Sequence, residues 1–339
     1  MIVVLKAGAS KVQINAVIRE VRKLGYKPHP IRGVERTVVA AIGDERVHHT
    51  LETLTSMSGV DQVMPVQRRY KLVSREANPG GSVVRVRGVP FGGKDFPVIA
   101  GPCSVESEKQ VLETARAVKR AGAKLLRGGA FKPRTSPYEF QGLKEEGLKL
   151  LAAARAETGL GIVTEVLSER DVELVARYAD MLQIGTRNAQ NFALLVAAAE
   201  SGKPILLKRG MSMRIEEWLF SAEYVLSRGN PNVILCERGV RTFETLTRNT
   251  LDLGAVALAK RETHLPVIVD PSQGAGRADL VSAMSRGAAA VGADGLIIEV
   301  HPDPREAMSD GAQQVTPVQF TQLIADLKPF LKASGRRLA

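Results

Sequence analysis

The sequence predicts a (β/α)8 barrel, the TIM-barrel fold, preceded by a small α+β domain. From residue 97 onward, short apolar segments alternate with amphipathic helical stretches, and eight such units fill about 235 residues. The first 70 residues instead follow the order strand, helix, strand, strand, helix, strand, which is typical of a ferredoxin-like unit. We therefore expect a ferredoxin-like domain over residues 1–70, a connector with a barrel-closing hairpin over 71–96, and the barrel over 97–335.

The small domain is predicted from its spacing of apolar residues. Ser10 can cap a first helix whose apolar residues from Ile14 to Leu24 follow helical spacing, and Gly25 ends it. A second helix is expected over Val47–Met57. The expected strands are Ile2–Lys6, Tyr26–Arg32, Arg36–Ile42 and Val60–Val66. Two helices cover one face of such a sheet, which leaves the other face for a ligand or a second subunit.

The connector and the barrel strands are marked by turn residues and short apolar runs. The run Asn78-Pro79-Gly80-Gly81 is a strong turn signal, and Val83–Val86 with the Phe91-Gly92-Gly93 turn predicts a hairpin that closes the bottom of the barrel. The expected barrel strands are Val98–Ala100, Lys124–Leu126, Gly161–Thr164, Met181–Ile184, Pro204–Leu207, Val233–Leu235, Pro266–Val269 and Gly295–Ile298. Helical stretches such as Glu108–Ala121 and Leu143–Glu157 separate them. An open doubly wound sheet is the alternative, although no G-x-G-x-x-G motif supports a dinucleotide-binding fold.

Composition excludes several classes of protein. The 339 residues are 44% hydrophobic and carry a net charge of +11, of which residues 1–75 contribute 13 Lys/Arg against 6 Asp/Glu. Aromatic residues make up only 4% and no long Lys/Arg block occurs, so we expect no nucleic-acid partner. No apolar run is long enough to span a membrane or to form a signal peptide. Only Cys103 and Cys236 occur, which favours a cytoplasmic protein without a disulfide framework.

Charged residues follow the predicted barrel strands, at the end where such barrels place their active sites. The cations are Arg127, Lys132, Arg134, Arg187, Lys208, Arg209 and Arg238. Each by itself would be an ordinary solvated charge, but together on one rim they would repel one another unless anions or carboxylates neutralise them. Guanidinium groups bind phosphate and carboxylate through paired hydrogen bonds, and lysine supplies a point charge. The sequence thus predicts substrates that carry two or more phosphate or carboxylate groups.

A thiol and two carboxylates follow the first and the last barrel strands. Cys103 comes after the first strand and Glu299 and Asp310 after the eighth, a donor set that suits Zn²⁺, Mn²⁺ or Fe²⁺. His301 lies two residues after Glu299 and therefore on the same strand face. The alternative is that Glu299 and Asp310 only pair with nearby arginines, and spacing alone leaves both interpretations open.

Segments along the whole barrel closely resemble the type I-beta class of 3-deoxy-D-arabino-heptulosonate 7-phosphate (DAHP) synthases. They are GPCSVES at 101–107, LLRGGAFKPRTSPYEFQG at 125–142, IGTRNAQNF at 184–192, LLKRGM at 206–211, CERGVRTFE at 236–244, TRNTLDL at 247–253, DPS at 270–272, EVHPDP at 299–304 and SDGAQ at 309–313. The resemblance implies a transferase that condenses phosphoenolpyruvate with erythrose 4-phosphate and water to give DAHP and phosphate, the first step of the shikimate pathway to the aromatic amino acids. The N-terminal domain resembles the regulatory domain of members inhibited by an aromatic amino acid, which implies feedback regulation.

The resemblance also implies a role for each site residue. The residues that would hold the phosphate and carboxylate of phosphoenolpyruvate are Arg127, Lys132, Arg187, Lys208 and Arg238, with Arg127, Lys132 and Cys103 as catalytic residues. Those that would hold the phosphate of erythrose 4-phosphate are Arg134, Thr135 and Ser136, and the metal ligands would be Cys103, Glu299 and Asp310. The related 3-deoxy-manno-octulosonate 8-phosphate synthases, which use arabinose 5-phosphate, carry a Lys-Ala-Asn-Arg-Ser type of segment where this chain has Lys-Pro-Arg-Thr-Ser. They are the enzymatic alternative. Glu165, after the third strand, would position water or pair with an arginine.

Two residues depart from the family's pattern. Gln273 stands where the family has a histidine as fourth metal ligand, and an amide oxygen is a harder and weaker donor than imidazole. Gln273 could bind a harder metal such as Mn²⁺, give way to water, or impair the site; we expect a weakened but retained site. His29 matches the effector site of tyrosine-inhibited members, whereas Ile31 replaces a serine, so the effector differs or is absent.

Two further expectations follow from the resemblance and from these departures. Because the family is usually oligomeric, the resemblance implies a homo-oligomer, either a dimer or a tetramer. The alternative from another class is a metabolite-sensing binding protein whose barrel is inactive because Gln273 has spoiled the metal site.

Overall fold

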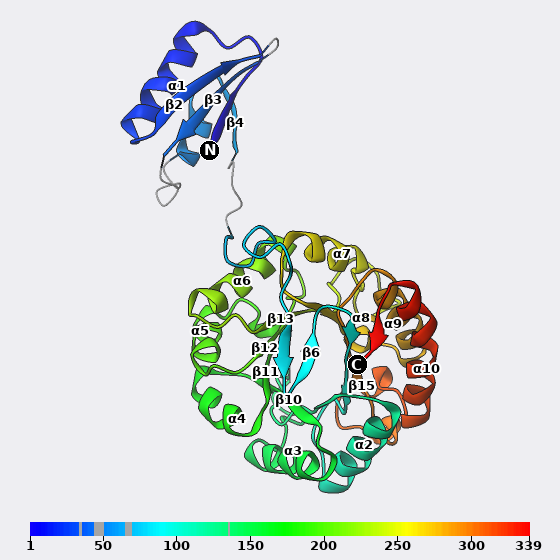
Figure 1. Cartoon of the computed structure of the whole chain (residues 1–339). Helices are drawn as coiled ribbons and strands as arrows, with labels where there is room; N and C mark the ends of the chain where they lie inside the picture. Colours follow the sequence, from blue (N-terminus) through cyan, green and yellow to red (C-terminus); the bar gives the residue numbers. More distant parts are fainter. Residues whose placement is uncertain (34–35, 44–50, 65–69, 135) are drawn as a thin grey trace. The chain divides into compact units, whose positions relative to one another are not determined.

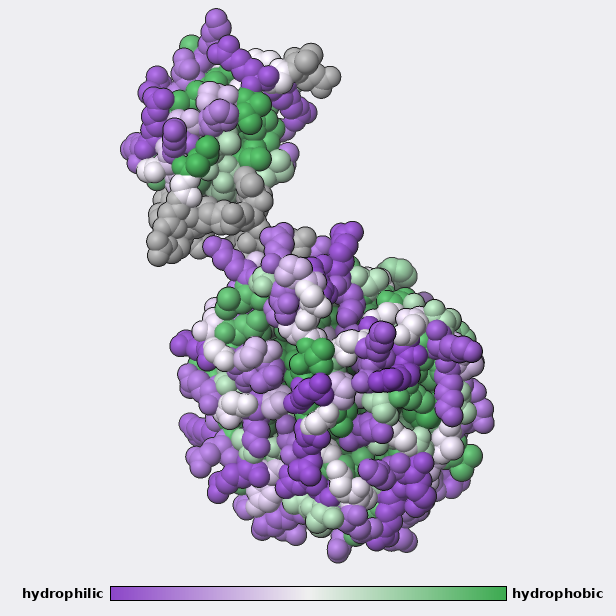
Figure 2. All heavy atoms as spheres, viewed as in Figure 1, coloured by the Kyte–Doolittle hydropathy of each residue, from purple (hydrophilic) through white to green (hydrophobic). Residues whose placement is uncertain are grey.

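The computed structural model describes residues 1–33, 36–43, 51–64, 70–134 and 136–339. The chain divides into two compact units, Met1–Arg69 and Tyr70–Ala339. No helix within these described residues is long and apolar enough to cross a membrane. Hydrophilic side chains spread over the barrel face in view in Figure 2, with hydrophobic side chains in smaller groups between them.

The first unit is a four-stranded antiparallel sheet in the order β2-β3-β1-β4, with helix α1 packed against it. Its elements are β1 Ile2–Leu5, α1 Lys11–Lys23, β2 Lys27–Arg32, β3 Thr37–Ile42, the 3-10 helix η2 Glu52–Ser56, and β4 Val60–Met64. Ser10 caps α1 as expected, because its hydroxyl accepts a hydrogen bond from the Gln13 amide while the Gln13 side chain accepts one from the Ser10 amide. Val17 and Val21 on α1 are fully buried against the sheet.

The second helix of this unit differs from the expectation. Residues 47–50 lie outside the described residues, and the remainder is only the short η2. The Ser56 hydroxyl donates to the Thr53 carbonyl oxygen at 2.7 Å, and such side-chain bonds compete with a continuing α-helix. Strand β4 is described as far as Met64, and the last residues expected for it, 65 and 66, also lie outside the described part.

The second unit is a closed barrel of eight parallel strands, which confirms the predicted (β/α)8 fold over an open sheet (Figure 1). The strands are β8 Val98–Gly101, β9 Leu125–Arg127, β10 Gly161–Val166, β11 Met181–Ile184, β12 Ile205–Lys208, β13 Val233–Glu237, β14 Val267–Val269 and β15 Leu296–Glu299. The pairing of Glu299 with Gly101 joins the last strand to the first and closes the ring. This closure brings residues about 200 positions apart in the sequence onto neighbouring strand ends.

Helices surround the ring of strands (Figure 1). They are α2 Glu108–Ala121, α3 Glu145–Thr158, α4 Val172–Tyr178, α5 Phe192–Glu200, α6 Ile215–Ser227, α7 Leu253–Glu262, α8 Pro271–Ala275, α9 Ala278–Ala290 and α10 Pro317–Ala333, with 3-10 turns η3 Glu169–Asp171, η4 Thr186–Asn188, η5 Pro304–Glu306 and η6 Gly311–Gln313. Apolar residues of strands and helices form one continuous buried layer. Short strands β7 Asp95–Phe96 and β16 Arg337–Leu338 pair in parallel and hold the C-terminal segment.

A hairpin of β5 Val84–Val86 and β6 Val89–Phe91 lies across the centre of the ring in Figure 1. Its buried side chains pack against strand residues inside the barrel, including Ile99 and Leu125, and so close one end. The turn of this hairpin lies at Arg87-Gly88. The turn expected at Phe91-Gly92-Gly93 begins only after the hairpin, at Gly93-Lys94, where Gly92 pairs with Asp95. Both turn residues have positive φ, 47° and 81°, which a two-residue loop of type I′ requires and Gly88 readily supplies.

Candidate active site

A pocket with about 300 Å³ of free space opens where the strands end, within the size range of small-molecule sites. Its cationic lining residues are Lys132, Arg134, Arg187, Lys208, Arg238, Arg241 and Arg248. Its carboxylates are Glu139, Glu165 and Asp310. Seven cations against three carboxylates leave an excess of positive charge, which favours anionic ligands.

Most of the residues predicted to bind phosphoenolpyruvate lie in this pocket. Lys132, Arg187, Lys208 and Arg238 line it, whereas Arg127 is not a lining residue and is 4% exposed. The Arg127 guanidinium lies 3.1 Å from Glu299 Oε1 and donates to the Pro102 carbonyl oxygen. Arg127 is therefore placed to orient the Glu299 carboxylate.

Arg209 does not share this pocket, contrary to the expectation of seven cations on one rim. Its guanidinium donates to Glu237 Oε2 at 2.9 Å and to Asp252 Oδ2 at 3.1 Å. Glu237 is fully buried, and burial, only partly offset by Arg209, raises the pKa of its carboxyl group. Arg209 is consequently occupied in neutralising a buried carboxylate.

The segment expected to bind erythrose 4-phosphate is described in part. Arg134 lines the pocket and donates from Nε to Glu139 Oε2 at 3.0 Å. Ser136 is not among the lining residues, and its hydroxyl accepts the Tyr138 amide at 3.3 Å, while Thr135 lies outside the described residues. His29, the expected effector residue, is exposed on β2 in the first unit.

Two lining cations, Arg241 and Arg248, were not singled out from the sequence. Both belong to the loop between β13 and α7, and in a sequence a loop arginine looks like any solvated charge. The signal that could have found them is their place in the segments CERGVRTFE and TRNTLDL, which carry the family resemblance.

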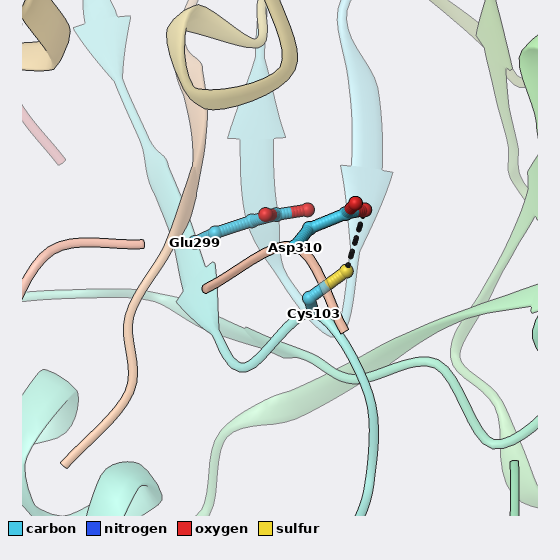
Figure 3. Close-up of side chains that lie close together, drawn as sticks. All are labelled: Cys103, Glu299 and Asp310. Carbon is cyan, nitrogen blue, oxygen red and sulfur yellow. Dashed lines mark hydrogen bonds between the residues drawn. The ribbon is translucent and has the colours of Figure 1, made fainter. Parts of the chain in front are cut away.

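Cys103, Glu299 and Asp310 come together at the closure of the barrel, with one ligand atom of each within 4.8 Å of the others (Figure 3). Asp310 Oδ2 accepts a hydrogen bond from Cys103 Sγ at 3.3 Å. His301 does not join them, because β15 ends at Glu299 and the alternation of side chains ends with it; its Nε2 lies 3.2 Å from Glu106 Oε2 instead.

A metal binds cysteine as the thiolate, so the pKa of Cys103 bears on whether these residues fit a metal. Burial, and then the nearby Glu299 carboxylate, raises the pKa of the Cys103 thiol to about 12. Lys132, with Nζ 3.0 Å from Sγ, acts in the opposite direction. A divalent cation favours the thiolate strongly, and thiolate with two carboxylates is a donor set for Zn²⁺, Mn²⁺ or Fe²⁺. The three residues therefore form a possible metal-binding triad.

Gln273 lies beside this triad on α8. Its Oε1 accepts hydrogen bonds from Lys208 Nζ at 3.2 Å and Arg238 Nε at 3.4 Å, and its Nε2 donates to Glu299 Oε1 at 3.5 Å. Turning the amide over would set its NH₂ group against two cations and its oxygen against a carboxylate oxygen. This arrangement faces the amide nitrogen, which cannot bind a metal, toward Glu299.

Glu165 enters the same pocket through a gap left by Gly185. Its Oε2 accepts a hydrogen bond from Gln183 Nε2 at 3.2 Å. A Cβ atom at position 185 would lie 1.8 Å from Glu165 Oε1, so a glycine is required at that position for the carboxylate to lie there.

A (β/α)8 barrel whose mouth gathers cations beside a buried thiol and two carboxylates defines an enzyme that acts on small anionic substrates. Residues 82–333 match the DAHP synthetase I family, and residues 1–68 match the DAHP synthase ferredoxin-like domain. The chain belongs to the DAHP synthetase I family, and the predicted resemblance and the carbon–carbon bond-forming transferase class are confirmed.

Similar proteins agree with this assignment. The chain is 50% identical over 335 residues to phospho-2-dehydro-3-deoxyheptonate aldolase of Thermotoga maritima, covering 99% of both chains. A crystal structure of a DAHP synthase from Thermotoga maritima has a TM-score of 0.93 and 48% identity, covering 100% of this chain and 99% of that one. A 2-dehydro-3-deoxyphosphooctonate aldolase of Bradyrhizobium diazoefficiens is 34% identical over 73% of this chain and 94% of its own. The octulosonate enzymes are thus more distant, and that alternative is not favoured.

Proposed function

We propose that the chain condenses phosphoenolpyruvate with erythrose 4-phosphate and water, giving DAHP and phosphate, as the first step toward the aromatic amino acids. The observation that carries this proposal is the cationic pocket beside Cys103, Glu299 and Asp310, in a chain similar over its full length to an enzyme named for that product. Two substrates with three anionic groups between them match its excess of positive charge.

Phosphoenolpyruvate would occupy the side of the pocket near Gln273. Lys208 Nζ and Arg238 Nε both donate to the same amide oxygen, so their hydrogens converge on one point where a phosphate or carboxylate oxygen could replace it. Lys132 and Arg187 line the same pocket. Arg127, which is buried and is not a lining residue, would add positive charge behind the pocket wall. Arg134, with Thr135 and Ser136, would hold the phosphate of erythrose 4-phosphate, which orients its aldehyde toward phosphoenolpyruvate.

The condensation joins C3 of phosphoenolpyruvate to the aldehyde carbon. A divalent cation held by Cys103, Glu299 and Asp310 would act as a Lewis acid toward the aldehyde oxygen. The arginines and lysines hold both anions in attack geometry, which removes much of the entropic barrier. Lys132 would give a proton to the alkoxide that forms from the aldehyde; in support, its Nζ lies 3.0 Å from Sγ of Cys103, one of the residues that would hold the cation. Water then adds at C2, and phosphate leaves as the C2–O bond breaks.

The first unit would regulate the barrel, as its ferredoxin-like family indicates. His29 and Ile31 lie two residues apart on β2, and both are exposed, so a small effector could contact both. The chain would act in the cytoplasm, since its two cysteines are free and buried, and as a homo-oligomer. Assays with Mn²⁺, with and without tyrosine or phenylalanine, would identify the effector.

The test of the reaction is phosphate release from phosphoenolpyruvate by the full chain supplied with Mn²⁺. Release should require erythrose 4-phosphate and should not occur with arabinose 5-phosphate. Preference for arabinose 5-phosphate would show that the protein is instead a 3-deoxy-manno-octulosonate 8-phosphate synthase. Binding of phosphoenolpyruvate without any phosphate release would favour the metabolite-sensing alternative.

A further inference from the structure

Arg248 and Gln313 connect the two carboxylates of the triad through a chain of hydrogen bonds. Arg248 Nη1 donates to Asp310 Oδ1 at 2.9 Å and to Gln313 Oε1 at 3.0 Å. Gln313 Nε2 in turn donates to Glu299 Oε2 at 2.7 Å. Gln313 is 1% exposed, so its amide is held within the protein interior.

These hydrogen bonds determine which carboxylate oxygen of Asp310 faces the thiol. Arg248 occupies Oδ1, and the other oxygen, Oδ2, lies 3.3 Å from Cys103 Sγ. At Glu299, Gln313 donates to Oε2, and Gln273 Nε2 donates to Oε1 at 3.5 Å. The Arg127 guanidinium adds an ion pair with Oε1 at 3.1 Å, so contacts at both oxygens resist rotation of the carboxylate. The two acids are therefore oriented before any cation arrives.

Asp310 needs such support because of its backbone. Its φ is +51°, in the left-handed region that a residue with a side chain adopts at a cost, and it stands at the start of the short turn η6. No strand holds it, in contrast to Glu299 at the end of β15. Its side chain thus depends on its hydrogen-bond partners for a defined position.

The backbone of Arg248 is held by several contacts, although its side chain is 45% exposed. Its amide donates to the Ala275 carbonyl oxygen at 3.1 Å, and its side chain lies against Gly276, where an added Cβ would be 2.3 Å from Arg248 Cβ. The loop around it is closed by two backbone hydrogen bonds between Val240 and Thr250, 3.0 Å and 2.9 Å long. The loop that carries the Arg248 guanidinium is therefore held in place by backbone hydrogen bonds.

An ion pair whose arginine is this exposed contributes little to folding. Stability alone therefore gives no reason for Arg248 to contact both Asp310 and Gln313. We infer that Arg248 and Gln313 are positioning residues that orient Asp310 and Glu299 for binding a divalent cation. This inference rests on the proposed function, because it assumes that these carboxylates bind the metal.

The test measures metal affinity rather than turnover. The full chain is stripped with a chelator and titrated with Mn²⁺, and free Mn²⁺ is read by electron paramagnetic resonance. Arg248→Ala and Gln313→Met should each raise the Kd by roughly 10- to 100-fold, as loss of such outer partners does. Arg248→Lys, which keeps the charge, should recover part of the loss. The double variant should be little worse than either single one, because both act through one network.

Arg305→Ala is the matched control, since Arg305 pairs with Asp303 in the same region of the chain but is 89% exposed and outside the network. Its Kd should equal that of the wild type. The melting temperature of each metal-free variant shows whether folding has changed, and Arg248→Ala, at the exposed end, remains informative if Gln313→Met does not fold. Wild-type binding with an unchanged Kd in Arg248→Ala would overturn the inference and leave the proposed reaction intact. No Mn²⁺ binding by the wild type would overturn the metal centre itself, and this inference with it.

Discussion

The Gln273 side-chain oxygen accepts a hydrogen bond from Lys208 Nζ at 3.2 Å, so the residue expected to replace a histidine ligand is joined to a cation that lines the pocket. Its amide nitrogen faces Glu299. Gln273→His should tighten binding of Zn²⁺ or Mn²⁺ by about tenfold or more, because imidazole adds a fourth protein ligand. Titration of the metal-free protein measures this, and an unchanged affinity would show that position 273 lies outside the coordination shell.

Removal of the metal should stop the reaction. Excess chelator is expected to abolish phosphate release, and Mn²⁺ added beyond the chelator should restore it, because a cation held by the triad would supply Lewis-acid chemistry at the aldehyde. Full activity in excess chelator would show that the reaction does not require a divalent cation. A melting curve of the stripped protein controls for unfolding.

Arg134 should discriminate between the two substrates. Its guanidinium lines the pocket and pairs with Glu139. Arg134→Ala should raise the KM for erythrose 4-phosphate by roughly 10- to 100-fold, as expected for a lost hydrogen bond to a charged group of about 1.5–3 kcal/mol. The KM for phosphoenolpyruvate should change little. Arg116→Ala, which removes an exposed pair with Glu157 on the barrel exterior, is the control. An unchanged KM for the sugar phosphate would refute the assignment.

Gly185 should tolerate no side chain. Gly185→Ala places a methyl group against Glu165 Oε1, so the carboxylate must move, at a cost of about 1–3 kcal/mol in stability. Turnover should fall as well, since Glu165 lines the pocket. Gly254→Ala on α7 is the matched control, because its nearest neighbour would be 3.4 Å away and alanine favours a helix. Equal stability of the two variants would contradict the steric argument.

Glu223 should matter for stability and not for chemistry. Its carboxylate accepts hydrogen bonds from the backbone amides of Lys71, Leu72 and Val73 at 2.9, 2.8 and 2.9 Å, which fixes the segment that enters the barrel. Glu223→Ala should lower the free energy of unfolding by about 1–3 kcal/mol, since these amides lose their acceptor. Chemical denaturation measures the loss. The KM values should stay at wild-type level, and a large change in them would show that this segment contributes to the pocket.

Much of the barrel could be predicted because each element carries its own local signal. The apolar run Met181–Ile184 and the helix Glu108–Ala121, capped by Ser107 and ended by Gly122 with a φ of +106°, depend on residues close in sequence. The 3-10 turn η2 was missed, because a local hydrogen bond from the Ser56 hydroxyl to the Thr53 carbonyl oxygen favours it over a longer helix. The position of the hairpin turn was missed, because it depends on positive φ angles at Arg87 and Gly88.

Contacts between distant residues were harder to predict. A strand end followed by Arg127 or Arg209 looks the same in sequence, yet Arg127 lies 3.1 Å from Glu299 and Arg209 binds Glu237 instead. Each choice follows from which buried carboxylate the fold places nearby. The orientation of the Gln273 amide could not be predicted either, because it depends on two donors and one acceptor that are distant in sequence. Lys208 on β12 and Arg238 just after β13 donate to its oxygen, and Glu299 on β15 accepts from its nitrogen.

The barrel, the small domain before it and the kinds of side chain that meet at the mouth could be predicted from sequence, since apolar spacing and strand-end residues are local properties of the chain. Three features required the folded structure: which of these side chains share the pocket, which pair with buried acids, and that Arg248 and Gln313 contact the triad. Closing the ring of strands brings residues from opposite ends of the barrel sequence within hydrogen-bond reach, and burial then requires every charge among them to find a partner.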